Sequence, residues 1–75
     1  MIRKKDYSGE YFDALELADI EIGNEYLGRK YIHPSYLAGA RLTAVKKGRK
    51  NVIVKHPAYS ETFNVDPEYL EEIVK

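Results

Sequence analysis

The sequence predicts a small, mainly β protein, and three observations lead to that prediction. Its 75 residues suit one domain with a small core, because a chain of this length buries only about 60% of its unfolded-state surface. Short segments rich in valine, isoleucine and tyrosine are separated by glycine and proline signals along most of the chain. Two of those segments, RLTAVKK and NVIVK, flank a glycine as the strands of a hairpin do.

The first nineteen residues are predicted to be a tail followed by a short helix. Tyr11, Phe12 and Leu15 recur at helical spacing, and the alanine, leucine and glutamate around them favour helix. We therefore expect one or two helical turns between Glu10 and Asp19, with residues 3–8 fraying. The next segment predicts a turn at Gly23-Asn24 and a strand over about residues 25–32.

A hairpin is predicted for residues 40–57. Ala40, Leu42 and Ala44 alternate with polar or exposed positions, and Val52 and Val54 do the same on the second strand, whose two apolar faces indicate a central position. Between the strands lies KKGRK, where Gly48 can take the positive φ of a short hairpin loop. Pro57 is expected to end the hairpin, since it has no N–H to donate.

The C-terminal segment predicts one more strand, a single turn and a closing strand. In ETFNV, Phe63 and Val65 are expected to be buried. In DPEYLEEIV, Asp66 is a natural cap, Pro67 suits the first helical position, and Leu70 and Ile73 are spaced for the core. One 3₁₀ or α turn before a short last strand explains this pattern.

This order of elements resembles the small five-stranded SH3-like barrel, in which a 3₁₀ turn precedes the last strand. NVDPEYLEEI resembles the closing segment of such domains, and LTAVKKGRKNVIVKHP resembles their central hairpin. The hairpin is also similar to that of short phage- and prophage-type barrel proteins of unassigned function. The resemblance implies a barrel over residues 20–75, following the N-terminal segment 1–19, and it sets no single function, because these barrels bind proline-rich peptides, nucleic acid, ribosomes or other proteins.

Charge is segregated along the chain although the net charge is zero. Residues 6–27 carry seven acids and no lysine or arginine, whereas residues 28–55 carry eight bases and no acid. Either the two blocks form faces of opposite potential, or they interleave in space and pair with each other. The densest basic stretch, Lys46, Lys47, Arg49 and Lys50, is predicted to lie at the exposed tip of the hairpin.

The sequence carries no recognisable catalytic constellation, and we expect a non-enzymatic protein without cofactor, metal or small-molecule substrate. It has no cysteine, which excludes disulfides and thiolate zinc sites, and the GxSxG, HExxH and Walker-type patterns are missing. His33 and His56 each precede a proline and are more simply extended strand-end residues than metal ligands. No apolar stretch approaches the length of a membrane span, so a cytoplasmic protein without a membrane partner is expected.

Tyrosine is the most informative residue type, with seven in 75 positions. Tyrosines are enriched in protein interfaces, but in a chain with two phenylalanines and no tryptophan they also serve the core. In SH3-like barrels aromatic residues of the loops and the 3₁₀ turn line the peptide groove. That resemblance implies binding roles for Tyr69 and for Tyr31 or Tyr36.

Three functions are compatible with these observations. The first is a protein-binding adaptor or inhibitor of a partner or host protein that uses the tyrosines and the acidic face. The second is nucleic-acid binding, with Lys46, Lys47, Arg49 and Lys50 on phosphates and Tyr31 or Tyr36 stacking on bases. The third is DNA mimicry by acids of residues 6–27, which requires Glu10, Asp13 and Glu16 on one side of a helix.

Overall fold

The computed structural model describes residues 1–73 as seven short strands and three single 3₁₀ turns. In chain order the strands are β1 (Ile2–Lys5), β2 (Tyr11–Ala14), β3 (Glu25–Gly28), β4 (Arg41–Lys47), β5 (Val52–Lys55), β6 (Thr62–Val65) and β7 (Leu70–Glu72). The turns are η1 (Leu17–Asp19), η2 (Ser35–Leu37) and η3 (Pro67–Tyr69). In the described part of the chain, no helix is long and apolar enough to cross a membrane.

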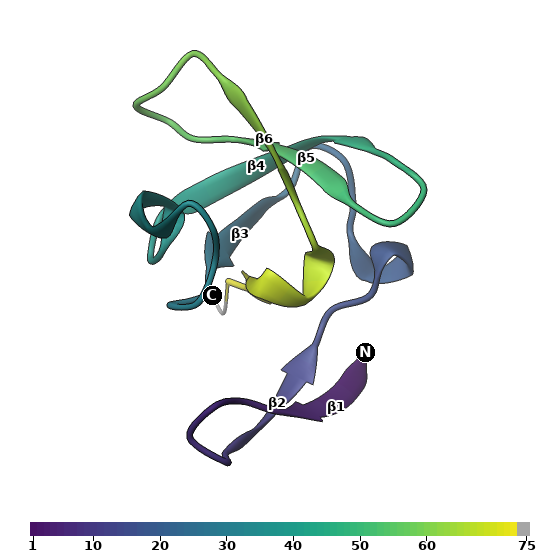
Figure 1. Cartoon of the computed structure of the whole chain (residues 1–75). Helices are drawn as coiled ribbons and strands as arrows, with labels where there is room; N and C mark the ends of the chain where they lie inside the picture. Colours follow the sequence, from purple (N-terminus) through teal and green to yellow (C-terminus); the bar gives the residue numbers. More distant parts are fainter. Residues whose placement is uncertain (74–75) are drawn as a thin grey trace.

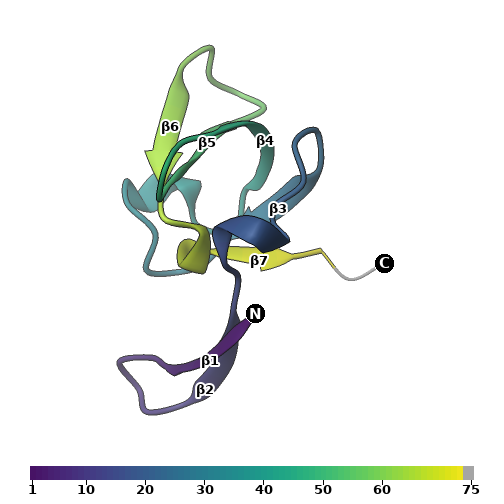
Figure 2. The ribbon, with the colours of Figure 1, turned by 90° about the vertical axis from the view of Figure 1, so that its right-hand side faces the viewer.

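The strands form two antiparallel sheets. The larger has the order β6-β5-β4-β3-β7, and the smaller is the hairpin of β1 and β2 (Figure 1). Figure 2 shows the large sheet curving from β6 to β3, with β7 beneath it and the hairpin standing outside the sheet. Within residues 1–73 no ladder joins β6 to β7, so the sheet stays open at that seam. The prediction of a mainly β protein is confirmed. The described residues do not form the closed barrel that was predicted for residues 20–75. The last two residues of that predicted unit lie outside the described part of the chain.

The N-terminal prediction is wrong for most of its length. Residues 11–14 form strand β2 instead of a helix, and only η1 supplies a single helical turn before Ile20. Residues 2–5 do not fray but pair with β2 in the register Ile2↔Ala14 to Lys5↔Tyr11. The alternation of exposed Tyr11 and buried Ala14 with their neighbours is that of a strand.

The side chain of Asp6 shapes the β1–β2 turn. Its Oδ1 accepts hydrogen bonds from the Ser8 amide at 2.9 Å, the Ser8 hydroxyl at 2.6 Å and the Glu10 amide at 3.0 Å. Gly9 takes a φ of 87° in the same turn. An aspartate that binds the backbone two residues on competes with helix and favours a turn, which explains why the helical spacing of this segment misleads.

The second half of the chain follows the sequence prediction closely. Strands β4 and β5 pair around the loop at residues 48–51, and β5 lies inside the sheet as expected. Asp66 caps η3 by accepting a hydrogen bond from the Glu68 amide, with Pro67 in the first position, and β7 follows. Two details differ from the prediction. The strand predicted for residues 25–32 ends at Gly28. Gly48 does not have a positive φ, and its loop is closed by a hydrogen bond from the Gly48 amide to the Asn51 carbonyl.

A β-bulge in β4 decides which way Lys46 points, and it places Lys47 opposite the buried Val52. The register runs from Ala44↔Val54 directly to Lys46↔Ile53, which leaves Val45 without a partner. Strict alternation after buried Leu42 and Ala44 would turn Lys46 toward the core. The extra residue reverses the alternation, so that Lys46 shares the outer face with Ile53 and is exposed.

The core lies on the inner face of the large sheet. Its buried members come from every part of the sheet and from the segments that cross it, and they are Leu15, Ile20, Tyr26, Ile32, Leu37, Leu42, Ala44, Val52, Val54, Val65 and Leu70. Tyr26 is the tyrosine that serves the core: it is 4% exposed, and its hydroxyl accepts a hydrogen bond from the Glu21 amide at 2.8 Å. Phe63 is half-buried, while Val65 is buried as predicted.

Candidate binding groove

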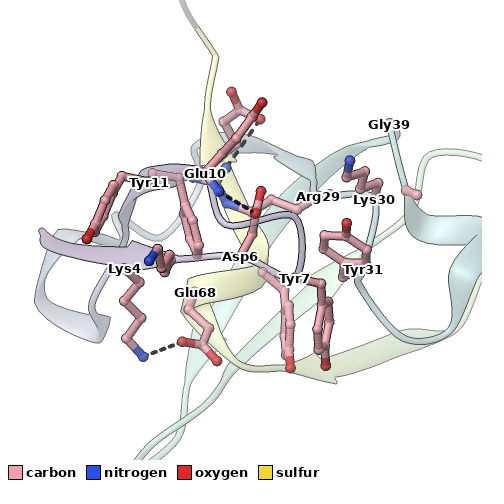
Figure 3. A pocket seen from close by; sticks show the side chains of 16 residues that line it. Lys4, Asp6, Tyr7, Glu10, Tyr11, Arg29, Lys30, Tyr31, Gly39 and Glu68 are labelled. Carbon is pink, nitrogen blue, oxygen red and sulfur yellow. Dashed lines mark hydrogen bonds and ion pairs between the residues drawn. The ribbon is translucent and has the colours of Figure 1, made fainter.

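An open groove of about 890 Å³ lies between the β1–β2 hairpin and the large sheet (Figure 3). Residues 4–7 and 10–12 of the hairpin form one wall, and residues 28–31 form the opposite wall. Turn η3 contributes Glu68 and Tyr69, and the segment after η2 contributes Ala38 and Gly39. Four segments of the chain therefore meet at one surface.

Close backbone packing at Gly28 fixes the sheet side of the groove. Its amide donates to the Ala40 carbonyl at 3.1 Å, and its carbonyl accepts from the Gly39 amide at 2.8 Å. A Cβ at position 28 would lie 2.1 Å from the Leu37 carbonyl oxygen. Only glycine permits this approach, which holds residues 37–40 against the end of β3.

Arg29 joins the hairpin to the sheet across the floor of the groove. Its Nη2 donates to the Asp13 carbonyl at 3.1 Å, and its Nη1 lies 3.8 Å from a carboxylate oxygen of Glu71. The guanidinium carbon lies 4.5 Å from the centre of the Phe12 ring. Its Nε is buried without a hydrogen-bond partner among the described residues. One side chain from the segment after β3 thus contacts both β2 and β7.

Two further contacts hold the hairpin turn and the first strand in place. The Lys4 ammonium pairs with Glu68 of η3, and this carboxylate raises the pKa of Lys4 (Figure 3). The Ser8 hydroxyl and then the amides of Glu10 and Ser8 hold the pKa of Asp6 below its usual range. The charges of Lys4 and Asp6 are thus engaged within the chain.

Aromatic rings form most of the apolar surface of the groove. The rings of Tyr7 and Tyr31 meet edge to face with their centres 4.9 Å apart, and both are labelled in Figure 3. Tyr69 is half-buried against the core, whereas Tyr7 is 88% exposed and Tyr11 60% exposed. Two large rings are therefore left for a ligand to cover.

Uncommitted charge in the groove is mainly positive. Lys5 and Lys30 have no ion pair with a described residue and lie over the rings of Tyr11 and Tyr31, with the ammonium 5.4 Å and 5.1 Å from the ring centres. Glu10 is the lining acid that has neither an ion pair nor a hydrogen bond from its side chain within residues 1–73. Two lysines and one glutamate are therefore left uncommitted among the described residues that line the groove.

The sequence-predicted site residues fall into three separate places. Tyr31 and Tyr69 both line the groove. Tyr36 lies in another cluster, with its ring centre 5.3 Å from that of Tyr59 and 5.8 Å from that of Phe63. The four predicted cations, Lys46, Lys47, Arg49 and Lys50, are exposed at the β4–β5 tip and do not line the groove.

These positions bear on two of the sequence hypotheses. Tyr31 lines the groove and Tyr36 contacts the β5–β6 side, at the opposite end of β5 from the tip, so base stacking by either ring stays a prediction. The helix that would align the acids for DNA mimicry is wrong, since Asp13 lies in β2 and Glu16 precedes η1. Among residues 1–73, no three histidine, aspartate or glutamate side chains gather as they would around a metal ion.

The acidic and basic blocks interleave in part. Four ion pairs join different blocks of the sequence: Arg3–Asp13, Arg41–Glu25, Lys4–Glu68 and Arg29–Glu71. The tip cations take no part in an ion pair with a described residue. Pairing thus removes part of the predicted segregation, and the densest group of cations without an ion pair among the described residues is at the tip.

The hairpin's part in the groove was missed from the sequence. Tyr7, Tyr11 and Arg29 were not predicted site residues, because residues 1–19 were expected to be a tail and a helix. A signal was present in DYSG, an aspartate–serine–glycine turn between IRKK and EYFDA. Comparison with known proteins gives no match to a family model, to a curated protein or to a solved structure.

Proposed function

We propose that this chain is a small, non-catalytic binding module that recognises a partner protein by holding an extended segment of it in the groove. The observation that supports this most directly is the gathering of Tyr7, Tyr11, Tyr31 and Tyr69 along one groove. Tyrosine supplies large contact area at low entropic cost, and it is enriched in protein interfaces. The volume of the groove suits a few side chains of a bound segment.

The partner segment is expected to be acidic. Lys5 and Lys30 are available at the groove, and Glu10 alone opposes them among the uncommitted charges. Carboxylates of the segment would pair with the two ammonium groups, while an apolar side chain between them would cover Tyr7. Complementary charge gives such a complex its specificity and a faster association rate.

We also propose that the large sheet is an open relative of the SH3-like arrangement. The strand order β6-β5-β4-β3-β7 and the 3₁₀ turn η3 directly before β7 support this proposal. In that arrangement the 3₁₀ turn and the loop after the first strand border the ligand groove, which is consistent with Tyr69 and Tyr31 lining it. Fold likeness supports a binding role in general and leaves the choice of ligand to the groove.

Selection from a random peptide library displayed on phage tests the proposal. The immobilised chain should enrich peptides with acidic residues around an apolar one, and calorimetry should then give their affinities. Tyr7→Ala removes a largely exposed ring and should weaken binding about tenfold, the effect of a modest interface hot spot. Lys30→Glu should weaken binding of the same acidic peptides.

Tyr59→Ala provides the matched control, because Tyr59 is also an exposed tyrosine but lies outside the groove. We expect this variant to bind the selected peptides within about twofold of the unaltered chain. An equal loss for Tyr7→Ala and Tyr59→Ala, or enrichment of basic peptides, would be incompatible with the proposed groove.

A further inference from the structure

We propose a second binding site at the β4–β5 tip, which would contact the phosphate backbone of double-stranded DNA. This tip is defined by residues 45–50, and it contains Lys46, Lys47, Arg49 and Lys50. It is separate from the groove, whose lining residues do not include it. The inference therefore goes beyond the proposed protein-binding function and does not depend on it.

The first argument is that the positive charge at the tip is unneutralised. All four cations are exposed, and none has an ion pair with a residue in the range 1–73. Among the other bases of residues 1–73, Arg3, Lys4, Arg29 and Arg41 are paired with carboxylates, whereas Lys5, Lys30 and Lys55 lie apart from the tip without an ion pair. Phosphate binding draws on such unpaired cations, because each phosphate that they neutralise releases a counterion.

Asp19, a carboxylate that interacts electrostatically with Lys47 of the tip, is already engaged. The Glu16 amide, followed by the Met1 ammonium, holds the pKa of Asp19 below its usual range, and Lys47 adds a smaller contribution. Asp19 Oδ2 accepts from the Glu16 amide at 2.8 Å and lies 3.0 Å from the Met1 ammonium. Lys47 thus lies within the field of this carboxylate without forming an ion pair with it.

The second argument is that the backbone presents these cations in a fixed way. The bulge at Val45 turns Lys46 outward, and the loop is closed by the hydrogen bond from the Gly48 amide to the Asn51 carbonyl at 2.7 Å. Because β5 is an inner strand of the large sheet, the tip is anchored to a packed element (Figure 1). An ordered backbone at the tip lowers the conformational entropy that is lost on binding.

The third argument selects duplex DNA among the polyanions. Residues 45–50 contain no aromatic residue on which an unpaired base could stack, which disfavours single strands. Val45 is the only apolar side chain at the tip, so insertion into a lipid surface has little apolar area to draw on. A duplex, in contrast, carries about one negative charge per 1.7 Å of helix axis, so clustered cations can contact its phosphates without base stacking or apolar insertion.

Fluorescence anisotropy with a labelled duplex of about 20 base pairs tests this site, since that length spans about two helical turns. If all four cations contact phosphates, the slope of log K against log salt should be about −3.6, so that affinity falls roughly 100-fold between 50 and 200 mM salt. Arg49→Gln should reduce the steepness of this slope by about 1. Tyr7→Ala should leave duplex binding unchanged, which distinguishes this site from the groove.

Lys55→Gln is the control of equal charge. Lys55 is exposed, lacks an ion pair with a described residue and lies at the other end of β5, away from the tip. This variant should keep the full salt slope. Absence of duplex binding at 50 mM salt, an equal effect of Arg49→Gln and Lys55→Gln, or preferential binding to single strands or to vesicles with anionic headgroups would each overturn the proposal.

Discussion

Replacing Gly28 by alanine should destabilise the protein more than any other glycine-to-alanine change considered for the groove and its surroundings. The new Cβ would lie 2.1 Å from the Leu37 carbonyl oxygen, whereas ordinary contact begins near 3.4 Å. The carbonyl cannot withdraw easily, because Leu37 is fully buried and hydrogen bonds join Gly28 to Ala40 and Gly39 on both sides. The strand end and residues 37–40 would have to separate.

The magnitude follows from two costs. Overpacking of a well-packed site costs about 1–3 kcal/mol, and each displaced backbone hydrogen bond adds about 1 kcal/mol. We therefore expect Gly28→Ala to lower the free energy of unfolding by at least about 3 kcal/mol. For a chain of 75 residues, that corresponds to a fall in Tm of roughly 12–24 °C.

Urea and thermal unfolding followed by circular dichroism measure this effect, with two graded controls. At Gly39, φ is 75° and a Cβ would meet nothing within 4 Å, so Gly39→Ala should cost only the left-handed strain of about 1–2 kcal/mol. Gly48→Ala places its Cβ 3.3 Å from the Asn51 carbonyl oxygen without positive φ and should cost less than about 1 kcal/mol. Equal stability of Gly28→Ala and Gly48→Ala would refute the reasoning.

Three more perturbations examine the turn, the core and the docking of the hairpin. The pKa of Asp6 is lower in the folded chain than in the unfolded chain, so its ionised carboxylate stabilises the turn. This stabilisation is fully present above the unfolded-state pKa, near 3.9, and is lost as the pH falls through the folded-state pKa. NMR titration of the Ser8 amide should show that transition, and Asp6→Asn should abolish it. Leu42→Ala in the fully buried centre of β4 should cost about 2–5 kcal/mol in urea unfolding; a cost under about 1 kcal/mol would contradict the assigned core. Lys4→Glu should speed amide hydrogen exchange in the hairpin, because it removes the ion pair with Glu68. The double variant Lys4→Glu with Glu68→Lys reverses the two charges and should restore the protection. No change in either variant would mean that this ion pair does not hold the hairpin.

The second half of the fold could be predicted from the sequence because its signals are local and consistent with one another. Alternation in β4 and β5, the cap at Asp66 and the proline at position 67 each indicate the same element that the structure contains. The loop conformation at Gly48 and the bulge at Val45 could not be read in this way. Both depend on the cross-strand register, which the sequence of one strand does not specify.

The N-terminal half was harder to predict because local propensity and tertiary contacts disagree. Residues 10–15 have helical spacing, yet the Asp6 turn and pairing with β1 make them a strand. Arg29 then docks this hairpin through Asp13 and Phe12, a contact between residues sixteen or more positions apart. Tyr31 and Tyr69 were predicted through a resemblance, but their neighbour Tyr7 could be recognised only after the hairpin was placed.

Together the two proposed sites describe an adaptor that holds an acidic protein segment and contacts duplex DNA at separate surfaces. The groove lies beside the hairpin. The tip lies at the end of β4 and β5, and Figure 1 shows the loop that joins these strands. Both surfaces use cations that lack an ion pair with a described residue, so both interactions should weaken as salt increases. Their separation predicts that a variant of one site retains binding at the other.

The central claim, that the groove is the protein-binding site, is tested most directly by an NMR titration of the ¹⁵N-labelled chain with a peptide from the library selection. We expect the largest amide shifts at Tyr7, Tyr31, Gly39 and Tyr69, with little change at Tyr59 or Arg49. Shifts centred on Tyr59 or on the β4–β5 tip, with the groove amides unmoved, would contradict the account.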